Sequence, residues 1–276
     1  MKLWYQSMSR QMWGAYNRVL RDLLDHARDA ETQIEVHGVR AAGNPLRDVE
    51  RLERDTVVEN VRRAAQLGFE AFLIGSVADP GLAEARAIVD IPVLGLGETI
   101  LHVAAMMGAK FSLIAIDESR AARLVDNAAR YGLANRLNSV EHLQLERLRD
   151  LQLGFDDSET RAKLLARFAE AGQAAVAAGA DAIVVGSGPM MALLASGQIG
   201  ETTDGTPVVD GIANLVKLGE MAVKVNRILG GKFTEDRIPV AIELLRSYDA
   251  IPSAAAPAGS AATLAPGGPL GQFKAS

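Results

Sequence analysis

The chain of 276 residues contains no cysteine, and only 5% of its side chains are aromatic. Without cysteine it can form no disulfide bond, no thiolate zinc site and no thiol nucleophile. It also lacks an apolar run of the roughly 18 residues that a membrane-spanning helix needs, and its first residues lack the layout of a signal peptide. These absences predict a cytoplasmic protein that does not bind a membrane.

The charge of the chain is modest and evenly spread. The formal net charge is -5 at pH 7 and the pI is about 5.5, with Lys and Arg scattered along the sequence. Proteins that bind nucleic acid carry clustered positive charge instead. The sequence therefore predicts no nucleic-acid partner.

No motif for a cofactor or a metal is present. Gly95 and Gly97 begin a pattern that a dinucleotide-binding loop would continue with glycine at position 100, where the chain has Ile100. No Walker sequence and no GxSxG turn occurs. The four histidines lack the spacing of metal ligands; they are His26, His37, His102 and His142. We expect no cofactor and no metal.

Short runs of Ile, Val and Leu alternate with amphipathic segments. This alternation predicts an α/β fold in which mostly parallel sheets are flanked by helices. Asp79, followed by Pro80, is expected to cap the start of a helix from Leu82. Strands are expected at 2–6, 33–37, 70–75, 92–95, 111–116, 181–186 and 206–209, and helices at 11–30, 56–67, 82–89 and 160–178.

One nine-residue segment of the sequence occurs twice in similar form. Gly68–Ser76 (GFEAFLIGS) returns as Gly179–Ser187 (GADAIVVGS), so a buried strand ends in Gly-Ser in each half. The repeat predicts two pseudo-symmetric lobes, one formed by residues 1–105 with about 212–250 and the other by 106–211. Residues 253–276, rich in Ala, Gly, Pro and Ser, are expected to form a disordered tail.

Ligands of parallel α/β sheets bind beyond the carboxyl ends of the strands. We therefore expect one site between the lobes, with hydroxyls and backbone N–H groups suited to a small carboxylate or a carbonyl compound. The candidates that follow strand ends are catalytic Ser76, Ser187, His102 and Glu98, and substrate-binding Gln6, Ser7, Asp79, Thr99, Gly188 and Asp210.

Two of these assignments have structural alternatives. Ser76 and Ser187 could each cap the helix that follows. His102 lies four residues after Glu98, so a helix places them on one face. The carboxylate could orient the imidazole as a base, or the two could form an exposed ion pair.

Several of these segments resemble the aspartate/glutamate racemase superfamily, in particular its hydantoin racemase branch. The resemblance covers about residues 1–230. It rests on Ser76–Leu82 (SVADPGL), Ile91–Thr99 (IPVLGLGET), Met107–Phe111 (MGAKF), Gly179–Ser187 and Val208–Gly211 (VVDG).

The resemblance implies two α/β lobes around a central site and a pair of cysteines, one per lobe, that remove and return a proton at an acidic carbon. Those cysteines correspond to Ser76 and Ser187. A serine hydroxyl is far less acidic than a thiol and needs an adjacent base. The chain could therefore catalyse a different reaction, use another base such as His102, or be a Cys-to-Ser form of a racemase.

We expect an isomerase that acts on a small carboxylate or cyclic amide and assembles as a homo-oligomer. The alternatives are a lyase or hydrolase on the same scaffold, with Ser76 or Ser187 as nucleophile or water-orienting group, and a catalytically silent binder of small molecules.

Overall fold

The computed structural model describes residues 1–8, 14–39, 49–145, 147–231 and 233. The expected tail at 253–276 lies outside the described residues. The first half consists of β1 (Lys2–Ser7), α1 (Gly14–Ala27), β2 (Gln33–His37), α2 (Val49–Gln66), β3 (Ala71–Gly75), α3 (Leu82–Ile88), β4 (Val93–Gly95) and α4 (Leu96–Met107).

The second half contains a second set of strands and helices. They are β5 (Phe111–Ala115), α5 (Glu118–Arg130), the 3-10 helix η1 (Ala134–Arg136), β6 (Leu137–His142), α6 (Asp150–Leu153), α7 (Ser158–Ala177), β7 (Ala182–Val185), α8 (Gly188–Ser196) and α9 (Gly211–Ile228). No helix in these described ranges is long and apolar enough to cross a membrane.

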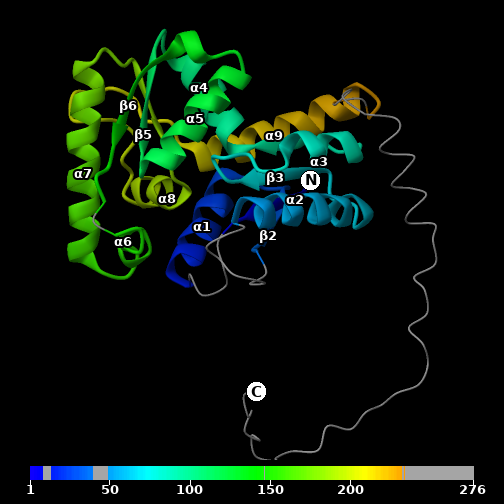
Figure 1. The fold of residues 1–276 in the computed structure, drawn as a ribbon. Coiled ribbons are helices and arrows are strands. Elements are labelled where there is room, and N and C mark those ends of the chain that lie inside the picture. Colours follow the sequence, from blue (N-terminus) through cyan, green and yellow to red (C-terminus); the bar gives the residue numbers. More distant parts are fainter. Residues whose placement is uncertain (9–13, 40–48, 146, 232, 234–276) are drawn as a thin grey trace, which may run out of the picture. The chain divides into compact units, whose positions relative to one another are not determined.

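The strands form two parallel sheets with matching order. The first has the order β2-β1-β3-β4, and the second has the order β6-β5-β7. Val208 adds a single parallel bridge to Ile183 of β7, at the place that β4 occupies in the first sheet. The α/β architecture predicted from the sequence is confirmed, and Figure 1 shows helices flanking both sheets.

Successive side chains along the strands of the first sheet pack into two different hydrophobic cores, one on each face of the sheet. Leu3, Tyr5 and Leu73 pack with residues of α1 and α9, whereas Trp4 and Phe72 pack with residues of α2 and α3. Because helices cover both faces of the sheet, the central strand β3 is apolar throughout, whereas the edge strand β2 (QIEVH) alternates polar and apolar residues. This arrangement explains why a continuous apolar run identified β3.

One strand prediction is wrong, and one strand was not predicted. The segment at 206–209 is no regular strand, since Val208 pairs only through one bridge to Ile183 and Pro207 through one to Glu201. The sequence also gave no indication of β6 (Leu137–His142), which pairs with β5.

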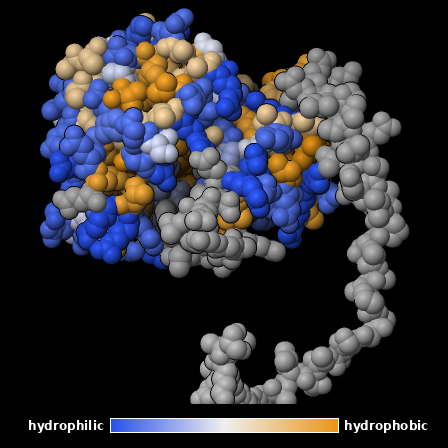
Figure 2. Space-filling view, in the orientation of Figure 1, coloured by the Kyte–Doolittle hydropathy of each residue, from blue (hydrophilic) through white to orange (hydrophobic). Residues whose placement is uncertain are grey.

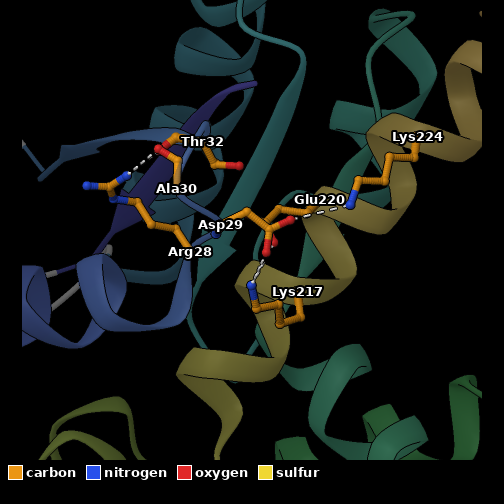
Figure 3. Close-up of polar contacts among 7 residues, drawn as sticks. All are labelled: Arg28, Asp29, Ala30, Thr32, Lys217, Glu220 and Lys224. Atoms are coloured by element: carbon orange, nitrogen blue, oxygen red, sulfur yellow. Dashed lines mark hydrogen bonds and ion pairs between the residues drawn. The ribbon is translucent and has the colours of Figure 1, made fainter.

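Helix α9 is attached to the first sheet by a charged cluster (Figure 3). The buried carboxylate of Glu220 accepts hydrogen bonds from the Asp29 backbone N–H (2.7 Å) and from Lys217 Nζ (3.0 Å). The Asp29 carboxylate in turn pairs with Lys217 at 2.7 Å and Lys224 at 3.3 Å. These bonds fix α9 to the turn between α1 and β2.

Candidate functional site

The two Gly-Ser steps end corresponding strands. Ser76 follows β3, which lies beside β1, and Ser187 lies two residues beyond the end of β7, which lies beside β5. The carboxyl ends of parallel strands share one edge of a sheet, and ligands of α/β proteins bind at that edge. The two hydroxyl groups therefore occupy equivalent places in the two sheets.

The glycine before each serine lies in close contact with a neighbouring side chain. A Cβ atom on Gly75 would lie 2.5 Å from Cε1 of Tyr5, and one on Gly186 would lie 2.5 Å from Cδ1 of Leu124. Both distances are shorter than any ordinary carbon contact. In each Gly-Ser pair, the glycine lets the backbone lie close to a neighbouring side chain, and the serine places a hydroxyl just beyond the strand end.

The two serines differ in their local bonding. Ser187 is buried and caps α8, because its Oγ accepts a hydrogen bond from the Met190 N–H at 3.3 Å. The capping alternative is confirmed for this residue, although its own O–H can still donate to a ligand. Among the described residues, Ser76 accepts only a long bond, from the Ala78 N–H (3.4 Å), and it does not cap α3, which begins after Gly81.

A buried tyrosine hydroxyl lies close to the chain near each Gly-Ser pair. The Tyr5 hydroxyl oxygen lies 2.6 Å from the position of a Cβ on Gly75, and the Tyr16 hydroxyl lies 3.6 Å from that of a Cβ on Gly188. Burial raises the pKa of both phenols above 10, and the interaction with Tyr16 raises the pKa of Tyr5 further. Both groups therefore stay protonated near neutral pH and can donate hydrogen bonds.

Neither tyrosine was among the site residues predicted from the sequence. Tyr5 lies in a buried strand, and Tyr16 lies on the apolar face of α1. The Tyr16 ring also packs edge-on against Phe155, with 5.4 Å between the ring centroids. The only available signal was that a buried tyrosine hydroxyl needs a polar partner.

Ser7 and Gln6 lie at the same sheet edge as Ser76. Ser7 is buried and pairs in register with Gly75. The buried Gln6 amide is bonded within the protein: Nε2 donates to the carbonyls of Ser7 and His37, both at 3.1 Å. Its Oε1 accepts from Trp4 Nε1 at 3.2 Å and Asn60 Nδ2 at 2.8 Å. Gln6 thus supports the strand end that carries Ser7.

The prediction that Asp79 caps α3 is wrong. Gly81, with a φ of 69°, precedes α3 without a side-chain cap. The Asp79 carboxylate instead caps α4, accepting hydrogen bonds from the N–H groups of Gly97 (2.8 Å) and Glu98 (2.6 Å). It also accepts one from the Tyr131 hydroxyl at 2.7 Å. Burial raises the pKa of Asp79 to about 7, and these three donors oppose that rise.

The predicted pairing of the Glu98 carboxylate with His102 is also wrong. Arg86 binds both carboxylate oxygens of Glu98, at 3.0 Å and 2.5 Å. His102 Nδ1 lies 2.8 Å from the backbone oxygen of Glu98 instead, and its side chain is exposed. In the described part of the chain, no contact joins His102 to Ser76 or Ser187.

The other predicted residues lie at helix starts. Thr99 is buried in the first turn of α4, and Gly188 is the first residue of α8. Asp210 is exposed and caps α9, accepting from the Ala213 N–H at 3.0 Å. Asp210 also borders a cavity of about 220 Å³ beneath α8, whose apolar lining includes Val185 and Leu194.

The arrangement offers hydroxyl and N–H donors at equivalent strand ends, namely the hydroxyls of Ser7, Ser76 and Ser187 and the N–H of Gly188 at the start of α8. Such donors can stabilise negative charge that develops on a carbonyl or carboxylate oxygen. Serine alone is a weak base, so removal of a carbon-bound proton needs a further group.

Comparisons with known proteins agree with this architecture. The family model for Asp/Glu/Hydantoin racemase matches residues 12–219. A hydantoin racemase from Pseudomonas sp. (strain NS671) is 29% identical over 172 residues, which span 62% of this chain and 65% of that protein. The hydantoin racemase of Paenarthrobacter aurescens is 28% identical over 222 residues, or 74% of this chain and 90% of that protein.

Solved structures share the fold. The allantoin racemase of Klebsiella pneumoniae superimposes with a TM-score of 0.67 at 23% identity, covering 82% of this chain and 89% of that one. The allantoin racemase of Pseudomonas fluorescens gives 0.66 at 19% identity, covering 82% and 92%. The family match covers most of the chain, and the resemblance noted in the sequence is confirmed. The chain belongs to the Asp/Glu/hydantoin racemase family.

Proposed function

We propose that this protein is a cofactor-independent isomerase that inverts an acidic carbon in a small carboxylate or cyclic amide. The observation that carries the proposal is the equivalent placement of Ser76 and Ser187 after β3 and β7. A racemase removes a proton from one face of a carbon atom and adds one to the opposite face. Two lobes with matching strand ends would supply one hydroxyl on each side of that carbon. Relatives named hydantoin racemase and allantoin racemase favour a cyclic amide as the substrate class.

In this proposal the hydroxyls of Ser76 and Ser187 donate hydrogen bonds to the substrate. They stabilise the enolate that forms when the acidic carbon loses its proton. Tyr16, Ser7 and the N–H of Gly188 add donors around the same oxygen atoms. The further residues Gln6, Thr99 and Asp210 hold the strand ends and helix starts that carry these donors.

We propose His102 as the group that carries the proton. A neutral imidazole nitrogen can accept the proton that leaves the acidic carbon, and solvent then supplies the proton that returns to the opposite face of the enolate. His102 lies on α4, which begins directly after β4. In a His102→Ala variant we expect carbon–hydrogen exchange to fall at least tenfold, and wild-type exchange would remove His102 from the mechanism.

The test is deuterium wash-in at the acidic carbon. The full chain is incubated in D₂O with single enantiomers of 5-benzylhydantoin and of allantoin, beside a blank without protein. We expect deuterium incorporation with inversion and no other change in mass. A change of mass from ring opening or loss of CO₂ would indicate a hydrolase or lyase, and a ligand-induced thermal shift without wash-in would indicate a silent binder; either result overturns the proposal.

Ser76→Ala and Ser187→Ala serve as matched variants. Each removes one hydroxyl, and we expect each to lower the wash-in rate by about a hundredfold to a thousandfold, the range for loss of one donor to a developing oxyanion. Equal rates in wild type and both variants would contradict the role of the strand-end hydroxyls.

We also propose that the protein assembles as a homo-oligomer. Among large apolar side chains, Ile228 is 83% exposed on α9 and Met106 is 74% exposed on α4, a helix that contacts α9. Figure 2 shows apolar patches among hydrophilic residues on the visible face of the described chain. Light scattering of the purified chain checks this proposal, and a monomer at micromolar concentration would contradict it.

A further inference from the structure

The turn that carries Ser76 is held by residues from distant parts of the chain. It runs from Ser76 to Gly81, between β3 and α3. Asp79 within it has a φ of 48°, in the left-handed region that residues other than glycine seldom adopt. Such a conformation persists only where surrounding contacts enforce it.

The first set of contacts joins the turn to the start of α4. The Asp79 carboxylate accepts the N–H groups of Gly97 and Glu98, at 2.8 Å and 2.6 Å. A Cβ on Gly95 would lie 2.3 Å from Asp79 Oδ1, and one on Gly97 would lie 2.7 Å from Oδ2. The glycines of the Gly95-Leu96-Gly97 segment therefore provide the space that this carboxylate occupies.

The second set of contacts comes from the end of α5, a helix that packs on β5 and β6 of the second sheet. Tyr131 follows the last residue of α5, and its hydroxyl donates to Asp79 Oδ2 at 2.7 Å. One helical turn earlier, the buried Asn127 donates through Nδ2 to the Val77 carbonyl at 3.4 Å. Residues of the second sheet's helix thus contact the turn at two places.

We propose that Asp79 is a positioning residue, which fixes the Ser76 turn to α4 and, through Tyr131, to the second lobe. This inference rests on the proposed function, because Ser76 matters only if it acts on a substrate. Asp79 itself is 6% exposed, and its two oxygens already accept three hydrogen bonds. It therefore acts through the turn and not as a ligand of the substrate.

The protonation of Asp79 makes the stability of the Ser76–Gly81 turn depend on pH. Burial raises the pKa of Asp79 from 3.8 to about 7, so the held turn binds a proton more tightly than an opened turn with a solvated carboxylate. Opening consequently becomes easier as the pH rises from about 4 to 7, and it depends little on pH above 7. The titratable and charged groups of the surrounding elements are Glu98 and His102 on α4, Arg86 on α3, and Tyr131 and Arg130 at the end of α5.

Hydrogen exchange measured on the full chain tests the inference without a substrate. Protection factors, which correct for the intrinsic pH dependence of amide exchange, are compared for the peptide covering 76–81 between pH 5 and pH 8.5. In wild type we expect protection to fall by up to about a hundredfold from pH 5 to 7 and then to level off. In Asp79→Asn, which cannot ionise, we expect a flat profile.

Two further variants sharpen the test. Tyr131→Phe keeps the ring but removes a donor that lowers the pKa of Asp79, so protection should be weaker and should continue to fall above pH 7. Asp157→Asn is the matched control: Asp157 also caps a helix, accepting the Thr160 N–H at 2.7 Å, but belongs to α7. Its profile for 76–81 should equal that of wild type.

A wild-type profile without a fall, or the same fall in Asp79→Asn, would overturn the inference. Where the wild type shows deuterium wash-in, Tyr131→Phe should lower kcat about tenfold with little change in KM, and an unchanged kcat would overturn the positioning role. Absence of wash-in in the wild type contradicts the proposed function alone, since the exchange profiles then still decide whether Asp79 holds the turn.

Discussion

Tyr5 occupies the space that a side chain on Gly75 would need, with Cε1 2.5 Å and the hydroxyl oxygen 2.6 Å from the position of a Cβ atom. Tyr5 is almost fully buried and lies between β1 and the helices α1 and α9. The ring therefore cannot move aside without disturbing the core. This contact links the packing of the first lobe to the position of the neighbouring Ser76.

We predict that Gly75→Ala lowers the free energy of unfolding by about 1 to 3 kcal/mol, the usual cost of overpacking a filled core. Chemical denaturation measures this change. Gly200→Ala is the matched control, because a Cβ at Gly200 has no atom within 4 Å. Equal stability of the two variants would mean that Tyr5 can move away from Gly75 at little cost.

We predict that Glu220→Ala destabilises the protein by about 1 to 3 kcal/mol, because it leaves the Asp29 N–H without its acceptor and removes a charge partner of Lys217. Thermal unfolding measures the loss. The control is Glu170→Ala, since within the described ranges Glu170 forms only an exposed pair with Arg167 on α7 and such pairs contribute about 0 to 1 kcal/mol. A smaller loss in Glu220→Ala than in Glu170→Ala would contradict the role given to the cluster that holds α9.

The sequence predicted most of the strands because they are buried on both faces. Residues 71–75 and 182–185 are apolar without interruption, and residues 111–115 contain a single polar residue, Ser112. Such runs can be recognised without knowledge of the neighbouring strands. Strand β6 was missed because its side chains are half-buried and polar. Its Ser139 bonds to Glu141 within β6 at 2.8 Å and to Ser112 of β5 at 2.9 Å, and the second bond exists only when β5 and β6 are adjacent.

The strand ends were predictable, whereas the partners of their side chains were not. The repeat placed Ser76 and Ser187 after β3 and β7, which depends on local sequence alone. Capping rules consider neighbours along the chain, so they assigned Asp79 to α3, although its carboxylate caps a helix that begins 17 residues later. Arg86, which binds Glu98, lies 12 residues away on another helix, so the spacing of residues along one helix could not predict this pair.

We predict that Tyr16→Phe lowers the rate of deuterium wash-in at least tenfold. The variant removes a protonated donor near Gly188 and keeps the ring that packs against Phe155. Wash-in kinetics with 5-benzylhydantoin measure the effect, and thermal unfolding serves as the check on folding. An unchanged rate would place the Tyr16 hydroxyl outside the group of donors to the substrate.

We predict that cysteine at positions 76 and 187 increases exchange at the acidic carbon. A thiol has a pKa near 8.5, and the start of α8 lowers it further at position 187, so a thiolate base becomes available on each side. Each single variant, Ser76→Cys or Ser187→Cys, should speed wash-in mainly from one enantiomer, because each supplies a base to one face only. The double variant should speed it from both.

Two controls test whether the increase in exchange depends on thiols at positions 76 and 187. Ser196→Cys adds a thiol at the last residue of α8, away from the strand ends, and should leave the exchange rate at the wild-type value. Reaction of each introduced thiol with iodoacetamide should return the rate to that of the matching alanine variant. A rate increase shared equally by both enantiomers in each single variant would contradict the arrangement of one hydroxyl on each face of the carbon.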